Sequence, residues 1–281
     1  MTQTRLRGST HQTIPPASHI RPRKSLGQNF LQDENICKKI VTSVAPRSSD
    51  VVLEIGPGEG ALTKHLAQKA KRLIAVDVDE RVVLRMRAEF PDVDIVHGDF
   101  LKLDLEAVAQ SYGGPLRLVG NIPYNITTPI LFHILDHRTS ITDAMLMVQR
   151  EVARRLVALP RSKDYGILSV SFQFFADVEV LFNVSRNAFY PKPDVMSSVL
   201  RLAFLAGPRY PVADEPMFRA MLRSIFGKRR KMLRSSLRYF CEEHGYPLPE
   251  GMDLTKRPED LSIRDLAQLS NMLVDTAPPS S

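Results

Sequence analysis

The hydrophobic positions between residues 50 and 121 fall into short runs that alternate with segments of helical periodicity. Each run contains β-branched residues or leucine and ends at a small or polar residue, as buried strands do. This alternation predicts parallel strands joined by right-handed helical crossovers. The expected strands are residues 51–56, 72–77, 93–99 and 116–121, and the expected helices are residues 61–69, 80–89 and 105–111.

The strand pattern continues toward residue 204 and then gives way to a helical one. Strand-like runs cover residues 144–149, 178–184 and 197–204, and a helix is expected at residues 150–159. We therefore expect an α/β fold with an open sheet of about seven strands. After residue 208, apolar residues recur at three-, four- and seven-residue spacings, as in amphipathic helices. The predicted parts are a flexible basic tail (1–22), the sheet domain (23–206), an all-helical C-terminal domain (209–275) whose last helix is residues 261–273, and a short tail (276–281).

Composition excludes several classes of protein. With 43% hydrophobic and 25% charged residues, the chain has the balance of a soluble globular protein, and it has no apolar run long enough to cross a bilayer. Its two cysteines are far apart, which argues against a disulfide scaffold and suits a reducing compartment. The seven histidines show no metal-ligand spacing, so we expect no metal site. The cysteine usage and the lack of a secretory apolar segment lead us to expect a cytoplasmic protein.

The charge is concentrated in two segments, although the net value is only +7. Residues 1–32 contain five basic and no acidic residues, and residues 219–238 contain eight basic and no acidic residues. A solvated helix face could give such a run, but two compact clusters favour a nucleic-acid partner. The first cluster also leaves open an organelle transit peptide, although the segment lacks a clear amphipathic pattern.

The ends of the expected strands carry the candidate chemistry, because ligands of such sheets bind beyond the carboxyl ends of the strands. The first strand ends in a glycine-rich turn, Gly56-Pro57-Gly58-Glu59-Gly60, and the second ends in Asp77, where an acid can accept ribose hydroxyls. The turn lacks the Gly-x-Gly-x-x-Gly spacing of nicotinamide dehydrogenases, and Glu59 would repel a pyrophosphate. Asp99 could accept a hydrogen bond from an adenine amino group. These ends favour S-adenosylmethionine, a nucleoside without phosphates.

The fourth strand ends in the sequence Asn121-Ile122-Pro123-Tyr124. Asn and Pro often form an ordinary turn, and that interpretation stays open. The alternative is a site for an adenine amine. The Asn121 side-chain carbonyl and the Ile122 main-chain carbonyl could accept hydrogen bonds from this amine. Pro123 would stiffen the turn and Tyr124 could stack on the base. Methyl transfer would then depend on orientation and dipolar stabilisation, and the base must be unstacked first.

Together these motifs resemble the rRNA adenine N6,N6-dimethyltransferases. The resemblance covers nearly the whole chain after the tail, and it is specific through the combination of motifs. The segments that carry it are residues 24–31 (KSLGQNFL), 54–58 (EIGPG), 98–99 (GD), 121–125 (NIPYN), 188–193 (AFYPKP) and 226–231 (FGKRRK).

The resemblance implies a Rossmann-like methyltransferase fold with a helical C-terminal domain. It also implies roles for individual residues. S-adenosylmethionine would be held by Asn29, Leu31, Gly56, Asp77, Asp99 and Asn121, and Phe189 would help to enclose the target base, although core packing would also explain this Phe. The family commonly has Glu where this chain has the shorter Asp77, which should still reach the ribose hydroxyls. The RNA contacts would include Arg23, Lys24, Lys228, Arg229, Arg230, Lys231 and Arg234, mostly to phosphates.

The resemblance also implies a substrate: two adjacent adenines in a loop near the 3′ end of small-subunit rRNA, within an assembling ribosomal subunit. We expect the enzyme to be a monomer. Resistance enzymes that methylate large-subunit rRNA share the fold, and so do non-catalytic RNA-binding or transcription factors. The basic segment at residues 226–238 and the full-length helical domain favour the small-subunit class, and the intact motifs argue against a non-catalytic factor.

Overall fold

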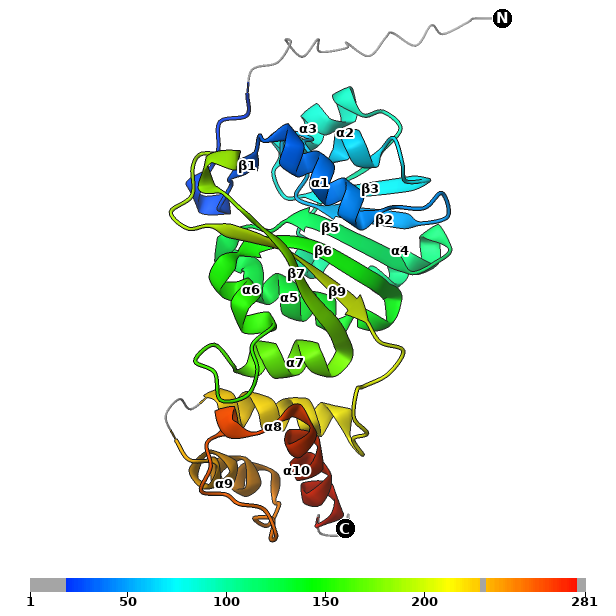
Figure 1. Ribbon diagram of the computed structural model, residues 1–281. Coiled ribbons are helices and arrows are strands. Elements are labelled where there is room, and N and C mark those ends of the chain that lie inside the picture. The colour runs from blue at the N-terminus through cyan, green and yellow to red at the C-terminus, as the bar shows by residue number, and fades with distance from the viewer. Residues whose placement is uncertain (1–18, 228–230, 277–281) are drawn as a thin grey trace, which may run out of the picture.

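A seven-stranded sheet forms the centre of the molecule (Figure 1). The computed structural model describes residues 19–227 and 231–276. The strand order is β4-β3-β2-β5-β6-β9-β7, in which the first five strands run parallel and β9 is antiparallel to both of its neighbours. The seven expected strands are confirmed. They are β2 (Val51–Ile55), β3 (Arg72–Asp77), β4 (Asp94–His97), β5 (Leu116–Asn121), β6 (Ile141–Gln149), β7 (Ala176–Val184) and β9 (Ser197–Phe204).

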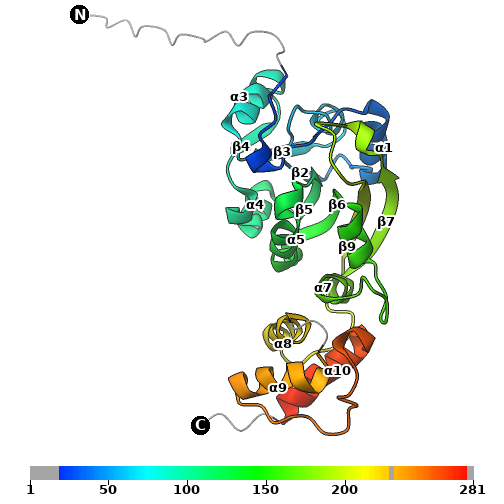
Figure 2. The ribbon, with the colours of Figure 1, turned by 90° about the vertical axis from the view of Figure 1, so that its left-hand side faces the viewer.

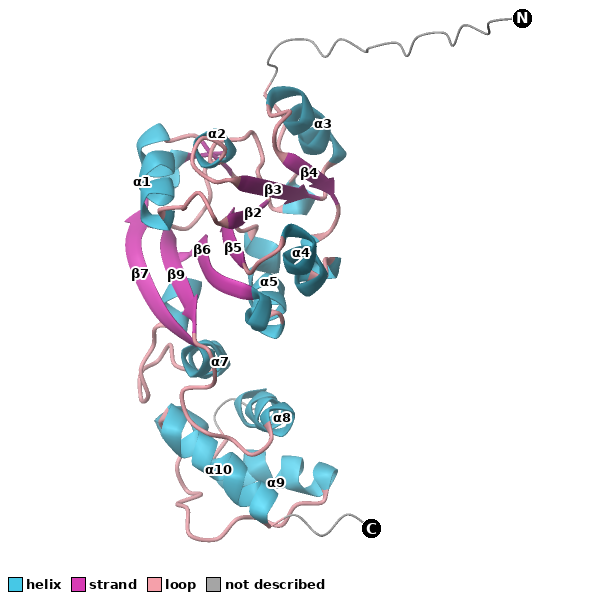
Figure 3. Ribbon diagram, turned by 90° about the vertical axis from the view of Figure 1, so that its right-hand side faces the viewer, coloured by secondary structure: helices cyan, strands magenta, loops and turns pink. Residues whose placement is uncertain are grey.

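Helices cover both faces of this sheet (Figure 3). α3 has the expected bounds, whereas α2 is a single short turn and α6 ends three residues before the expected position. The pattern did not predict α1, α5 or α7. Most residues of α7 are buried, so its apolar residues are not confined to one face. The helices are α1 (Glu34–Val44), α2 (Thr63–Leu66), α3 (Glu80–Glu89), α4 (Leu105–Tyr112), α5 (Thr127–Asp136), α6 (Arg150–Leu156) and α7 (Ile167–Phe175).

Three further helices gather beyond α7 at one end of the molecule (Figure 2). They are α8 (Glu215–Gly227), α9 (Leu233–His244) and α10 (Ile263–Asp275). The rings of Phe174 in α7 and Phe218 in α8 lie 4.5 Å apart, and Arg138 bonds Glu215 at 2.6 Å. A continuous apolar core therefore runs from the sheet into the helical region. None of the helices in the described part of the chain is long and apolar enough to cross a membrane.

A strap, residues 19–31, crosses the edge of the sheet where β2, β3, β4 and β5 end. It contains the short helix η1 (Lys24–Leu26) and finishes in β1 (Phe30–Leu31), which pairs antiparallel with β8 (Phe189–Tyr190). The backbone amide of Ile20 donates to Glu59 at 2.8 Å, so the start of the strap is anchored to the glycine-rich turn. The strap thereby forms a wall opposite the strand ends.

Candidate active site

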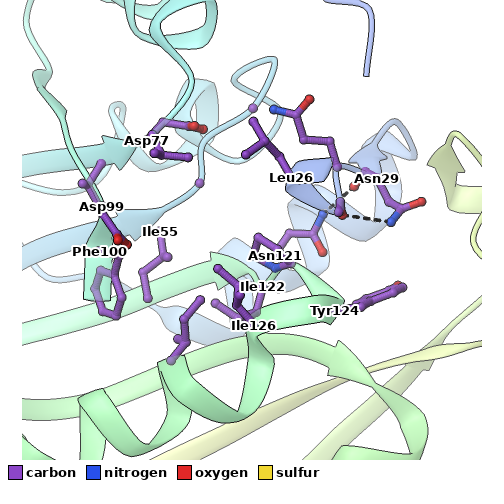
Figure 4. Close-up of a pocket in the computed structure, with 18 of the residues that line it drawn as sticks. Leu26, Asn29, Ile55, Asp77, Asp99, Phe100, Asn121, Ile122, Tyr124 and Ile126 are labelled. Carbon is purple, nitrogen blue, oxygen red and sulfur yellow. Dashed lines mark hydrogen bonds between the residues drawn. The ribbon is translucent and has the colours of Figure 1, made fainter. Parts of the chain in front are cut away.

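A pocket lies between the strap and the carboxyl ends of four parallel strands (Figure 4). Parallel strands end at a common edge, so residues far apart in the sequence meet there. Residues of the strap, including Leu26 and Phe30, line the facing wall. Of the residues predicted from the sequence, those that line this pocket are Asn29, Gly56, Asp77, Asp99, Asn121, Ile122, Pro123 and Tyr124.

The glycine-rich turn presents bare backbone to the pocket. Gly56, Gly58 and Gly60 have φ values of 66°, 55° and 80°, a region in which side chains with a Cβ are strained. A Cβ on Gly58 would come within 2.8 Å of the Phe30 ring, whereas one on Gly56 would meet no atom within 4 Å. The space beside Gly56 therefore remains for a ligand that approaches the main chain closely. This cradle fits the cofactor expected from the sequence.

Two carboxylates line the pocket from neighbouring strand ends. Asp77 ends β3 and accepts a hydrogen bond from the backbone amide of Asp79 at 2.8 Å. Burial raises the pKa of Asp77 to about 6, since a charged carboxylate loses hydration there. Asp99 follows β4, and one of its oxygens accepts from the amide of Leu101 at 3.0 Å. The two acids therefore supply separate acceptors for a hydroxyl-bearing ligand that also carries an amine.

Asn121 ends β5, and the strap fixes its side-chain orientation. Its Nδ2 donates to the main-chain carbonyl of Asn29 at 2.8 Å (Figure 4). A carbonyl can only accept, so the nitrogen of the amide must face Asn29 and the oxygen must point elsewhere. The Asn121 oxygen is thus available as an acceptor for an N–H group in the pocket.

The turn after Asn121 is held from two sides. The amide of Ile122 donates to the carbonyl of Met147 in β6 at 3.0 Å, and the Ile122 side chain is buried in the core. Tyr124 begins a short 3₁₀ helix, and its hydroxyl lies 2.6 Å from Oγ of Ser197 at the start of β9. Burial raises the pKa of the Tyr124 phenol. The Tyr124 side chain is therefore held at both ends, by the backbone of the 3₁₀ helix and by the contact of its hydroxyl with Ser197.

Comparison with known proteins identifies the group to which this site belongs. The family model described as ribosomal RNA adenine dimethylase matches residues 20–275. The chain belongs to this family. The chain is also similar to the ribosomal RNA small subunit methyltransferase A of Chlorobium phaeobacteroides (strain BS1), to which it is 46% identical over 254 residues, 90% of this chain and 94% of the relative. The protein of the same name from Chromohalobacter salexigens is 40% identical over 270 residues, 94% of this chain and 95% of the relative.

Two solved structures have the same architecture as this chain. A dimethyladenosine transferase from Plasmodium falciparum superposes with a TM-score of 0.67 at 26% identity, covering 85% of this chain and 95% of that one. The 23S rRNA methyltransferase ErmE superposes with a TM-score of 0.63 at 27% identity, covering 88% and 100%. The predicted Rossmann-like methyltransferase fold with a helical C-terminal region is confirmed.

Two predicted site residues of this dimethylase lie outside the main pocket. Leu31 lines a smaller adjoining cavity, which Gly56 and Asn121 also line. Phe189 pairs with Leu31 in the β1–β8 ladder and is buried in the apolar core beneath it. The described residues that line the main pocket do not include Phe189. Its contact with a target base therefore stays a prediction.

The predicted RNA-binding residues of the dimethylase are spread over the strap and the helical region. Arg23 and Lys24 are exposed on the strap, close to the pocket. Lys231 and Arg234 are exposed beside and within the first turn of α9. The remaining three, Lys228, Arg229 and Arg230, lie outside the described residues. The role of all these side chains in RNA binding stays a prediction.

Sequence reasoning missed several residues that shape the site. Glu54 is buried within β2, where it accepts from the hydroxyl of Thr63 at 2.6 Å, and burial raises its pKa to about 7. An acid inside an otherwise apolar strand was the available signal. Gln28 and Ser197 gave no such signal, because their partners are distant in the sequence.

Proposed function

We propose that this enzyme transfers methyl groups from S-adenosylmethionine to the N6 amines of two adjacent adenines near the 3′ end of small-subunit rRNA. Membership of the dimethylase family and the name shared by the two relatives described above support this substrate. The observation that carries the chemistry is the Asn121 amide, whose nitrogen is bound by the strap and whose oxygen is left for the amine. The products would be two dimethyladenosines, made during biogenesis of the small subunit.

Several residues of the pocket fit S-adenosylmethionine. The bare backbone at Gly56 would hold the methionine end, Asp77 would accept from the ribose hydroxyls, and Asp99 would accept from the adenine amine. Asn29 and Leu31 would close the site from the strap. When bound, the cofactor supplies an electrophilic methyl group on a sulfonium. The shorter Asp77 would reach the hydroxyls, since it lines the pocket directly.

The target amine would be oriented by the turn at the end of β5. An adenine amine is a poor nucleophile because its lone pair is delocalised into the ring. The Asn121 oxygen and the Ile122 carbonyl would accept hydrogen bonds from the two N–H groups of the amine and would favour a pyramidal nitrogen. The dipoles of these two acceptors would also stabilise the positive charge that develops on nitrogen. Pro123 would hold the turn rigid and Tyr124 would stack on the flipped base.

We infer that the partner is an assembling small ribosomal subunit and that the enzyme acts as a monomer in the cytoplasm. The exposed cations Arg23, Lys24, Lys231 and Arg234 would contact RNA phosphates, and Phe189 would help to enclose the base. A second candidate is methylation of large-subunit rRNA, which the similarity to ErmE favours. The higher identity to small-subunit enzymes, 46% against 27%, supports the first.

The deciding experiment uses small ribosomal subunits from a strain that lacks this methylation. They are incubated with the protein and labelled S-adenosylmethionine, and the rRNA is digested to nucleosides. We expect label in dimethyladenosine near the 3′ end of the small-subunit rRNA. Label on large-subunit rRNA alone would move the enzyme to the second candidate. Binding of the subunit without any label would contradict an enzymatic role.

A further inference from the structure

Asp79 is a buried acid that joins the strap to the strand ends. Its side chain has no exposed surface, and it caps the start of α3 by accepting from the amide of Arg81. The Arg81 guanidinium holds it from one side at 2.5 and 2.9 Å. From the other side, Nε2 of Gln28 in the strap donates to it at 3.0 Å. The same residue also donates its backbone amide to the pocket acid Asp77.

Gln28 uses both ends of its amide. Its Oε1 accepts from the backbone amide of Arg23 at 2.8 Å, which closes the turn of the strap, while its Nε2 reaches Asp79. The next residue, Asn29, presents the carbonyl that binds Asn121. A side chain held on the adjacent residue fixes where that carbonyl points, because only a few main-chain torsions separate the two groups.

The close contact between Gly27 and Asn125 leaves the strap little room to shift. Gly27 has a φ of 63°, and a Cβ at this position would lie 2.4 Å from the side-chain oxygen of Asn125. The strap backbone therefore packs directly on the turn that follows Asn121. A hydrogen bond from Gln28 to a buried carboxylate adds a directional, charge-assisted restraint to this packing.

We propose that Gln28 and Asp79 are positioning residues for methyl transfer: they hold the Asn29 carbonyl, which keeps the Asn121 amide oxygen turned toward the reacting amine. The role rests on the proposed function of Asn121. The alternative is that these residues only hold the strap over the cofactor, in which case their loss would change cofactor affinity alone. Positioning instead predicts a slower chemical step when the cofactor is saturating.

The substitution Gln28→Glu tests this role with little change in shape. The new carboxylate keeps the acceptor for Arg23 but places like charge against Asp79 in place of a donor. Gln32→Glu is the matched control, since Gln32 is exposed four residues along the chain and receives the same change. Thermal unfolding of each variant checks that the fold is retained, and Gln28→Ala provides a second variant without the repulsion.

The first readout is the single-turnover rate on small subunits at saturating S-adenosylmethionine. We expect Gln28→Glu to lower this rate by about tenfold or more, as small misplacements of a reacting pair do, and Gln32→Glu to leave it unchanged. In protein that already carries Asn121→Ala, Gln28→Glu should cause no further decrease in the single-turnover rate. An unchanged rate at saturation, or an equal additional loss in that background, would overturn the proposal.

The second readout needs no RNA. In ¹⁵N-labelled protein, the side-chain amide of Asn121 should have slowed hydrogen exchange, and Gln28→Glu should accelerate it while other amides keep their rates. Unchanged exchange of that amide would overturn the positioning role even if the rate fell. If the wild-type protein methylates no small-subunit adenine yet this exchange responds as expected, the proposed function fails and the structural link between Gln28 and Asn121 stands.

Discussion

The hydroxyl of Tyr124 lies 2.6 Å from Oγ of Ser197, and this contact joins the turn after β5 to the start of β9. Ser197 is completely buried. A bond at the far end of the Tyr124 ring restrains the plane of the ring, which the proposed stacking on a flipped base would require. We therefore predict that this contact between the two hydroxyls helps to place the target adenine.

Replacement of Ser197 by Ala should slow methyl transfer by about threefold to tenfold, since the buried Tyr124 hydroxyl loses its partner and the ring gains freedom. Ser197→Thr should restore much of the rate. Ser198→Ala is the matched control, because Ser198 is equally buried but donates to Asn183 at 2.8 Å. In a Tyr124→Phe background the effect of Ser197→Ala should vanish; an undiminished effect there would show that Ser197 acts by packing.

Replacement of Asn121 by Ala should reduce transfer by about a hundredfold or more, because the acceptor for the amine is lost. Cofactor affinity should change far less, since Asp77 and Asp99 remain. Single-turnover assays measure the first quantity and equilibrium dialysis with labelled S-adenosylmethionine measures the second. Wild-type turnover in this variant would refute the assigned chemistry.

Cofactor binding should weaken as the pH falls, because the ribose hydroxyls prefer an ionised Asp77. With the pKa raised to about 6 in the free protein, the dissociation constant should rise about fourfold between pH about 7.5 and 5.5. Asp77→Asn should bind more weakly overall and should lack this component of the pH dependence. The same slope in both proteins would assign the titration to another group.

Ionisation of Glu54 should make the folded protein less stable as the pH rises. Its pKa in the folded protein is about 7, above the value of 4.5 for the free side chain, so the folded state binds the extra proton between these values. The free energy of unfolding should therefore fall from pH 4.5 to 7 through this group. Its main cause is burial, which penalises the charged form.

Replacement of Glu54 by Gln removes that penalty and keeps an acceptor for Thr63. At pH about 8 the variant should be more stable than the wild type by about 1–3 kcal/mol, and the difference should shrink by pH about 5. Urea unfolding at the two pH values measures both differences. Glu106→Gln, an exposed change on α4, is the control. A variant that is less stable at pH 8 would contradict the predicted sign.

The exposed cations beside α9 should contribute to RNA binding through phosphates. Replacing Lys231 and Arg234 by Gln should weaken binding to small subunits and lower the slope of log affinity against log salt by about 1.4. Lys69→Gln with Lys102→Gln, an exposed pair on the sheet domain, should leave the slope unchanged. Equal slopes in both double variants would make the α9 cations a solvated helix face.

Much of the sheet was predictable from local pattern. The bounds expected for residues 72–77, 116–121 and 197–204 are those of β3, β5 and β9, because these strands are bounded by clear polar or small residues. The direction of β9, antiparallel to β6, was not predictable, since apolar periodicity carries no information on strand polarity. Helix α5 was also missed, since Thr127, Thr128 and Pro129 at its start disguise the helical pattern.

The sequence by itself determined the chemical groups of the site. The glycine turn at Gly56, the acids Asp77 and Asp99, and the amide of Asn121 each follow a strand, and parallel strands must end at one edge. Local order along the chain was therefore enough to bring them together. The motif at residues 24–31 indicated, through the resemblance, that Asn29 and Leu31 hold the cofactor. Residues 19–22 were assigned to the flexible tail, and nothing in their sequence indicated that Ile20 is anchored to Glu59.

Only the tertiary structure decided how those groups are held. The bond from Asn121 to Asn29 spans 92 residues, that from Tyr124 to Ser197 spans 73, and that from Gln28 to Asp79 spans 51. Each depends on side chains that local periodicity treats as ordinary polar residues. Their partners are set by the packing of the strap and β9 on the strand ends, and hydrogen-bond direction becomes defined only once both ends are in place.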